Sequence, residues 1–157
     1  MHPRLRLLAL GFLTFTLLVC AANAQDPAVT TPPATTGEVL VTVTGFKSEK
    51  GQVLVSLFVN DTGWPNDHDL AFASVALPIQ DAQAVATFKD VPAGPFAIST
   101  YHDENGNRKL DTGIFGIPKE RYGFSGNARA TFGAPSFEAA RLDLAAGNSM
   151  KIAIVVH

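Results

Sequence analysis

From residue 39 onward, hydrophobic residues recur at every second position, which is the pattern of β-strands with one buried face. Val39, Val41 and Val43 form one such series, and a second series covers residues 53–59. Lys50-Gly51 marks the turn between them. Further strand-like runs cover residues 73–79, 83–89, 95–102, 138–144 and 149–156. These seven short strands with turn signals between them predict an all-β fold, an antiparallel β-sandwich of prealbumin-like or immunoglobulin-like build.

The first 24 residues follow a different pattern. Arg4 and Arg6 precede an apolar run over residues 7–19, and the tripeptide ANA follows at residues 22–24. A positive start, a short apolar core and an A-x-A site predict a signal peptide that is cleaved after residue 24. The run of about 13 residues is shorter than a membrane-spanning helix requires. We therefore expect an exported protein, periplasmic or secreted, without a transmembrane span in the mature chain.

An alternative for the same segment is lipid attachment at Cys20, but the bulky Val19 before it fits that processing poorly. Residues 25–37 are rich in Thr, Pro and Ala and show no burial pattern, so they are predicted to form a flexible leader. One β-sandwich domain is expected over residues 38–157.

Removal of the signal peptide changes the charge and the cysteine count. The full chain has 157 residues, with 12 basic and 14 acidic ones. The mature chain keeps 133 residues, of which 10 are basic and 14 acidic, and it has no cysteine. A strongly cationic nucleic-acid binder and a disulfide framework are both excluded. The expected partner is an unidentified ligand or protein of the cell envelope.

An acidic and amide-rich segment interrupts the strand pattern at residues 103–111. Its side-chain oxygens have the offsets i, i+2, i+4 and i+8, which resemble the start of an EF-hand calcium loop. Backbone carbonyl oxygens are expected to complete such a site. The candidate metal residues are Asp103, Asn105, Asn107, Lys109 and Asp111.

Two departures from the EF-hand pattern lower the expected affinity. Arg108 stands where the pattern has Gly, and Ile114 stands where it has a bidentate Glu. The segment therefore predicts weak calcium binding, with a Kd of about 10⁻⁴–10⁻³ M. A purely structural turn at Asn105-Gly106 is the alternative, because Asn and Asp side chains also bind their own backbone.

Residues 112–136 form a long segment without a sustained period. It contains five glycines, two prolines and four aromatic rings, so we expect it to be ordered. It is either a structural cap over the sandwich or a surface that recognises a glycan, a peptide or an anion. The candidate ligand-binding residues are Phe115, Lys119, Arg121, Tyr122 and Phe124.

The search for catalytic residues finds no recognisable arrangement. His68, His102 and His157 lie far apart in the sequence, and the segment 123–126 lacks the spacing of a nucleophile elbow. A hydrolase that uses His102 with nearby carboxylates is the third hypothesis, and a non-enzymatic module is the leading one. Trp64 is interpreted as an anchor of the core or of a loop rather than as an exposed sugar-stacking ring.

A succession of short segments closely resembles the bacterial Domain of Unknown Function 2141 family over residues 39–156. This resemblance implies an exported β-sandwich without an assigned activity, and it supplies no catalytic residues. The segments that carry it are residues 90–97 (DVPAGPFA), 102–107 (HDENGN), 110–111 (LD), 116–120 (GIPKE), 122–125 (YGFS) and 132–137 (FGAPSF).

Overall fold

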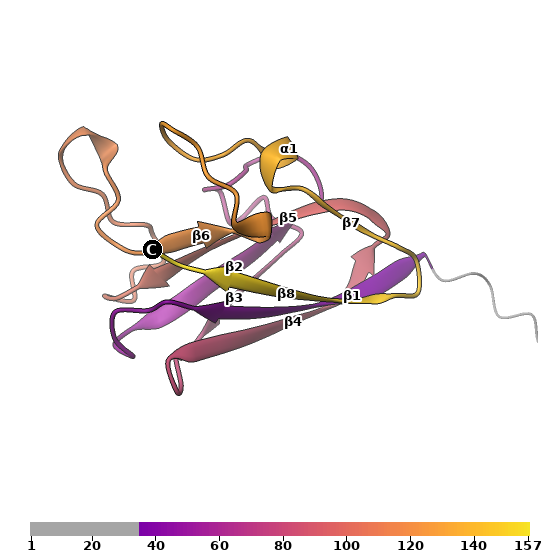
Figure 1. Ribbon diagram of the computed structural model, residues 1–157, viewed down its shortest axis with the longest axis horizontal. Helices are drawn as coiled ribbons and strands as arrows, with labels where there is room; N and C mark the ends of the chain where they lie inside the picture. Colours follow the sequence, from indigo (N-terminus) through magenta and orange to yellow (C-terminus); the bar gives the residue numbers. More distant parts are fainter. Residues whose placement is uncertain (1–34) are drawn as a thin grey trace, which may run out of the picture. The chain divides into compact units, whose positions relative to one another are not determined.

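The computed structural model describes residues 35–157, which fold into two β-sheets (Figure 1). The predicted signal peptide and most of the predicted leader lie outside the described residues. The three-stranded sheet has the order β4 (Gln83–Pro92), β1 (Thr36–Thr44), β8 (Ser149–Val155). The five-stranded sheet has the order β3 (Ala73–Leu77), β2 (Gln52–Phe58), β5 (Gly94–Asp103), β6 (Tyr122–Phe124), with β7 (Leu142–Leu144) also paired to β5.

The predicted all-β sandwich is confirmed, but the prediction of a purely antiparallel arrangement is wrong. β8 runs parallel to β1, with Val41 opposite Ile152, while β1 and β4 are antiparallel. The alternation of hydrophobic residues predicts a strand and its buried face, but it carries no information on the direction of the neighbouring strand. The described residues contain eight strands, so the prediction of about seven missed one.

The expected strand over residues 138–144 is only partly formed. Residues Phe137–Ala140 form a short helix, α1, whose N-cap is Ser136; the serine hydroxyl oxygen accepts from Ala139 N at 3.2 Å. The chain becomes extended again only in β7. The missed strand is β6, which lies inside the segment that showed no period.

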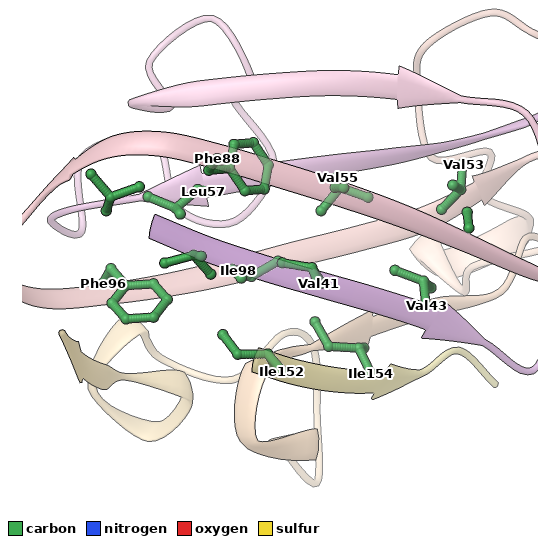
Figure 2. Packing of buried hydrophobic residues seen from close by; sticks show 14 of the residues in the cluster. Val41, Val43, Val53, Val55, Leu57, Phe88, Phe96, Ile98, Ile152 and Ile154 are labelled. Carbon is green, nitrogen blue, oxygen red and sulfur yellow. The ribbon is translucent and has the colours of Figure 1, made fainter. Parts of the chain in front are cut away.

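The space between the sheets is filled by the predicted alternating residues. Val39, Val41 and Val43 of β1 are completely buried, as are Ile98 of β5 and Ile154 of β8. Figure 2 shows Val41, Val43 and Ile154 of one sheet and Ile98 of the other with their side chains in the layer between the sheets. Burial of such a side chain contributes about 1.5–3 kcal/mol, so this layer holds the two sheets together.

A second, smaller cluster covers the outer face of the five-stranded sheet. Ala97 alternates with the core residues Phe96 and Ile98 along β5, so it lies on the opposite face, where it packs with Phe124. Trp64 packs against this cluster and donates from Nε1 to the carbonyl oxygen of Pro135 at 2.9 Å. The prediction that Trp64 is an anchor is confirmed. No helix within residues 35–157 has the length and hydropathy needed to cross a membrane.

Candidate functional site

Asp103, at the end of β5, organises the acidic loop. Its carboxylate is fully buried and accepts four N–H groups at 2.8–3.1 Å. One donor is the side chain of Gln52, which lies opposite Asp103 in the β2–β5 pairing, and the others are the backbone N–H groups of Gly106, Asn107 and Arg108. The loop thus closes around this carboxylate.

The other predicted metal residues converge on Asp111. Asn105 Nδ2 donates to Asp111 Oδ2 at 2.7 Å, and Asn107 Nδ2 donates to Asp111 Oδ1 at 3.0 Å. The Asn107 side-chain oxygen accepts from Lys109 N at 2.7 Å, so Lys109 joins the loop through its backbone. The candidate residues therefore do lie together in one loop.

The backbone of this loop has one further feature of a calcium loop. Arg108 has a φ of 60°, the left-handed conformation for which glycine is favoured, and it stands at the position where an EF-hand has glycine. Within residues 35–157 no group of three or more His, Cys, Asp and Glu residues is placed to hold a metal ion. The candidate set has only two carboxylates, and its remaining side-chain oxygens are amide oxygens. These oxygen ligands fit calcium better than a metal that prefers nitrogen or sulfur.

Glu120 ties the acidic loop to the segment that follows it. Its side chain is buried, and its two oxygens accept from Glu104 N at 2.8 Å and from Asp111 N at 2.9 Å. Both ends of the loop are therefore held by one carboxylate, which the sequence analysis did not assign to the loop.

His102 is buried on the core side of β5. It is fully buried; its Nε2 lies 2.7 Å from the carbonyl oxygen of Lys50, and its ring packs edge-on against Phe46. It alternates with Tyr101 along β5 and faces the core side, with Phe96 and Ile98. Within residues 35–157, His102 is not part of the lining of the cavity over the five-stranded sheet, so this geometry gives the hydrolase hypothesis no support.

A cavity of about 690 Å³ lies over the outer face of the five-stranded sheet. Ser99 and Tyr101 of β5 form part of its lining, together with Tyr122 and Phe124 of β6. Thr100 of β5 and parts of three loop segments complete the lining: residues 65, 66 and 68; residues 108–110, 112 and 115–118; and residues 131–134. This volume is in the range of small-molecule sites.

Aromatic and aliphatic side chains dominate the open side of this cavity. Phe115 and Phe132 both line it, although they are 95% and 92% exposed. Tyr122 is half-buried and Phe124 is buried, so the four rings of the long segment are not all covered by the loop. The segment is thus both a cap, through Phe124, and an open apolar surface.

The charged residues of the cavity are all cationic. Arg108 and Lys109 line it, and none of the lining residues within 35–157 is acidic. Of the other predicted cations, Lys119 is exposed outside the lining, and Arg121 is held away from it by a hydrogen bond to the carbonyl oxygen of Gly45. Both cations of the lining, Arg108 and Lys109, therefore come from the second half of the loop of residues 103–111.

Two further polar groups, His68 and Tyr101, lie at the cavity with their rings 5.3 Å apart. His68 Nδ1 lies 2.8 Å from the hydroxyl oxygen of Ser56, which is also 2.8 Å from that of Ser74. Burial lowers the pKa of His68, and this outweighs the neighbouring Asp67, so the imidazole is neutral at pH 7.

The Tyr101 hydroxyl is buried and has no hydrogen-bond partner within the described part of the chain. Burial raises its pKa far above the ordinary value, and the carboxylates of Asp103 and Glu120 raise it further. The hydroxyl is therefore a protonated donor without an acceptor.

No local sequence pattern places His68 and Tyr101 together, because the two residues come from a loop and a strand far apart in the chain. The available signal was Ser56, a polar residue in the middle of the otherwise apolar run of β2, and its register partner Ser74 on β3. A buried serine in such a strand needs a hydrogen-bond partner, and His68 is that partner.

A family model described as "Uncharacterized protein conserved in bacteria (DUF2141)" matches residues 41–153. The chain belongs to this family. The match confirms the predicted resemblance, and it spans all eight strands in whole or in part. Searches of curated proteins and of solved structures find no match. The DUF2141 description names no activity, so the chemistry of the cavity has to follow from the residues that line it.

Proposed function

We propose that this DUF2141 domain is a recognition module that binds a small amphipathic anion in the cavity over its five-stranded sheet. The observation that carries the proposal is a lining that combines Phe115 and Phe132 with Arg108 and Lys109 and, in the described part of the chain, contains no acidic residue. Rings provide the contact for an apolar body, and the two cations provide the contact for a negatively charged group.

The charges of the lining favour an anion over a cation. A cationic ligand would need a carboxylate for pairing, and the lining formed by residues 35–157 has none. The Tyr101 hydroxyl is buried, so it is not itself a contact for the ligand, and His68 is held by Ser56 at one ring nitrogen. An anion with an apolar body is therefore favoured over a cationic ligand.

A matched pair of fluorescent probes tests this proposal. The anion 1-anilinonaphthalene-8-sulfonate and the neutral N-phenyl-1-naphthylamine share their ring systems and differ in the sulfonate. We expect saturable binding of the anion, and we expect the Arg108→Gln/Lys109→Gln variant to weaken it by about tenfold, while the neutral probe changes by less than about twofold.

Lys89→Gln/Lys151→Gln is the control for this experiment. Both lysines are exposed on strands of the other sheet, so their removal changes the net charge equally without touching the cavity. The proposal is overturned if the wild-type protein shows no saturable binding, or if the control variant loses as much affinity as the cavity variant.

We also propose a weak calcium site in the loop of residues 103–111, which presents the cavity cations. Two observations favour it: the side chains of Asn105, Asn107 and Asp111 converge, and Arg108 has the left-handed backbone of a calcium loop. The ion would be held by oxygen atoms of this loop, where it would fix the backbone that carries Arg108 and Lys109. Its role would be structural and not catalytic.

A further inference from the structure

Four large apolar side chains form an apolar tip, which we define as Ile114, Phe115, Ile117 and Phe132. The first three are 80%, 95% and 64% exposed, and Phe132 is 92% exposed. Residues 111–119 form a narrow finger closed by the bridge between Thr112 and Pro118, and Phe132 lies in the neighbouring loop. Figure 1 shows both loops projecting on the same side of the domain.

The fold itself does not require these side chains. Phe115 has a φ of 63°, a left-handed conformation that is rare for a bulky residue, and its ring makes almost no contact that would compensate. A glycine at this position would relieve the backbone and remove the exposed ring. Clustered apolar residues that stability does not explain mark a surface that meets an apolar partner.

The surroundings of the tip are cationic. Arg108 and Lys109 are exposed beside Phe115 in the cavity lining, and Lys119 is exposed on the returning side of the finger. Within residues 35–157 both salt bridges are made by Arg141, so these three cations are not paired with a carboxylate.

The carboxylates nearest the tip are engaged in hydrogen bonds within the loop, whereas Arg108, Lys109 and Lys119 are exposed. Glu120 is buried and directs its oxygens to backbone N–H groups, and the Asp111 carboxylate accepts from Asn105 and Asn107. Apolar side chains surrounded by unpaired cations are complementary to a surface that is apolar inside and negatively charged outside.

We propose that the apolar tip docks on an anionic lipid bilayer. The four apolar side chains enter the interfacial region, and Arg108, Lys109 and Lys119 contact the lipid headgroups. Phe115, Phe132, Arg108 and Lys109 also line the cavity of the proposed function, but the docking assigns their exposed side to a bilayer and does not need a molecule bound in the cavity. If the partner of the tip were a protein, binding would not depend on anionic lipid.

Vesicle flotation tests the docking. The protein is used as it is purified after export, its N-terminus is determined by mass spectrometry, and all variants carry the same N-terminus. Phosphatidylcholine vesicles are compared with vesicles that also contain phosphatidylglycerol. We expect wild-type protein to bind the mixed vesicles about tenfold more tightly than pure phosphatidylcholine, with a loss of this difference at high salt.

Phe115→Ser/Phe132→Ser is the test variant, and we expect it to weaken binding to the mixed vesicles by about tenfold or more. The matched control is Val85→Ser/Val155→Ser, which removes two exposed apolar side chains from strands of the three-stranded sheet. Circular dichroism melts establish that every variant is folded. The proposal is wrong if wild-type protein does not float with the mixed vesicles, or if the tip variant binds them as well as wild type does.

The vesicle assay contains no cavity ligand, and the probe assay contains no vesicles. Failure of docking therefore leaves the proposed recognition of an amphipathic anion intact, and failure of probe binding leaves the docking intact.

Discussion

At the scale of single residues, Asp103 is the position on which the candidate site depends most. Burial of its carboxyl group raises the pKa, but hydrogen bonds from Gln52 and from the backbone of Arg108, Gly106 and Asn107 outweigh this effect. The pKa in the folded protein therefore lies below its ordinary value. The carboxylate consequently stabilises the fold in its charged form.

Replacement of Asp103 by Asn should lower the free energy of unfolding by roughly 2–4 kcal/mol at neutral pH, because an amide accepts fewer N–H groups and adds donors of its own. Since the folded pKa is depressed, the contribution is present above the unfolded pKa of about 3.9 and disappears as the pH falls through the folded value. Urea unfolding at a series of pH values measures it.

The pH series also contains its own check. Wild-type stability should fall more steeply below pH of about 4 than that of Asp103→Asn, whereas Asp143→Asn, at an exposed carboxylate, should follow the wild-type curve. Parallel curves for wild type and Asp103→Asn would show that this carboxylate does not stabilise the fold.

At the scale of elements, β5 is completed on one edge by two short strands and a single side chain. β6 pairs with residues 99–101 of β5, and β7 pairs with residues 94–96. Between them, the fully buried hydroxyl of Ser125 accepts from Ile98 N at 2.9 Å and donates to the carbonyl oxygen of Ala140. This side chain replaces the strand that is missing at Ile98.

Ser125→Ala should therefore lower the free energy of unfolding by about 2 kcal/mol or more, because it leaves a buried donor and a buried acceptor without partners. Ser149→Ala is the control, since Ser149 is exposed at the start of β8, and its effect should stay within about 0.5 kcal/mol. Chemical denaturation of both variants measures the difference; equal stabilities would mean that solvent or a shift of β6 satisfies Ile98 N.

These elements also show how far the sequence predicts the fold. The sequence predicts the longer strands β1, β2, β4, β5 and β8, because each is long enough to repeat the two-residue period several times. β6 has three residues, which is too short for a period, and its existence depends on pairing with β5. The parallel placement of β8 beside β1 is likewise a long-range property.

At the scale of the whole molecule, the candidate site combines parts that the sequence marks to different degrees. The acidic loop and the ring-rich segment were recognised from composition, and the chain does bring both to one cavity through Arg108, Lys109 and Phe115. The floor was not recognised, because His68 and Tyr101 meet only when β2, β3 and β5 lie side by side. Local patterns predict loops, whereas a cavity requires the sheet that joins them.

Calcium should act on the molecule as a whole, because a ligand that binds only the folded state raises its stability by RT ln(1 + [L]/Kd). For a Kd of about 10⁻⁴–10⁻³ M, calcium at about 10 mM should add about 1.4–2.7 kcal/mol and raise the melting temperature by several degrees relative to chelator. Thermal melts of the exported protein measure this shift.

Asp111→Asn is the decisive variant for calcium. Asp103 has a structural role of its own, so its removal would unfold the loop with or without an ion. Within residues 35–157, by contrast, the Asp111 side chain accepts from the two asparagine amides only. We expect Asp111→Asn to remove the calcium shift and to change the melting temperature in chelator only slightly. Asp143→Asn should keep the full shift. Equal melting temperatures of wild-type protein in calcium and in chelator would mean that the loop is a structural turn, which positions Arg108 and Lys109 through the carboxylates of Asp103 and Glu120 alone.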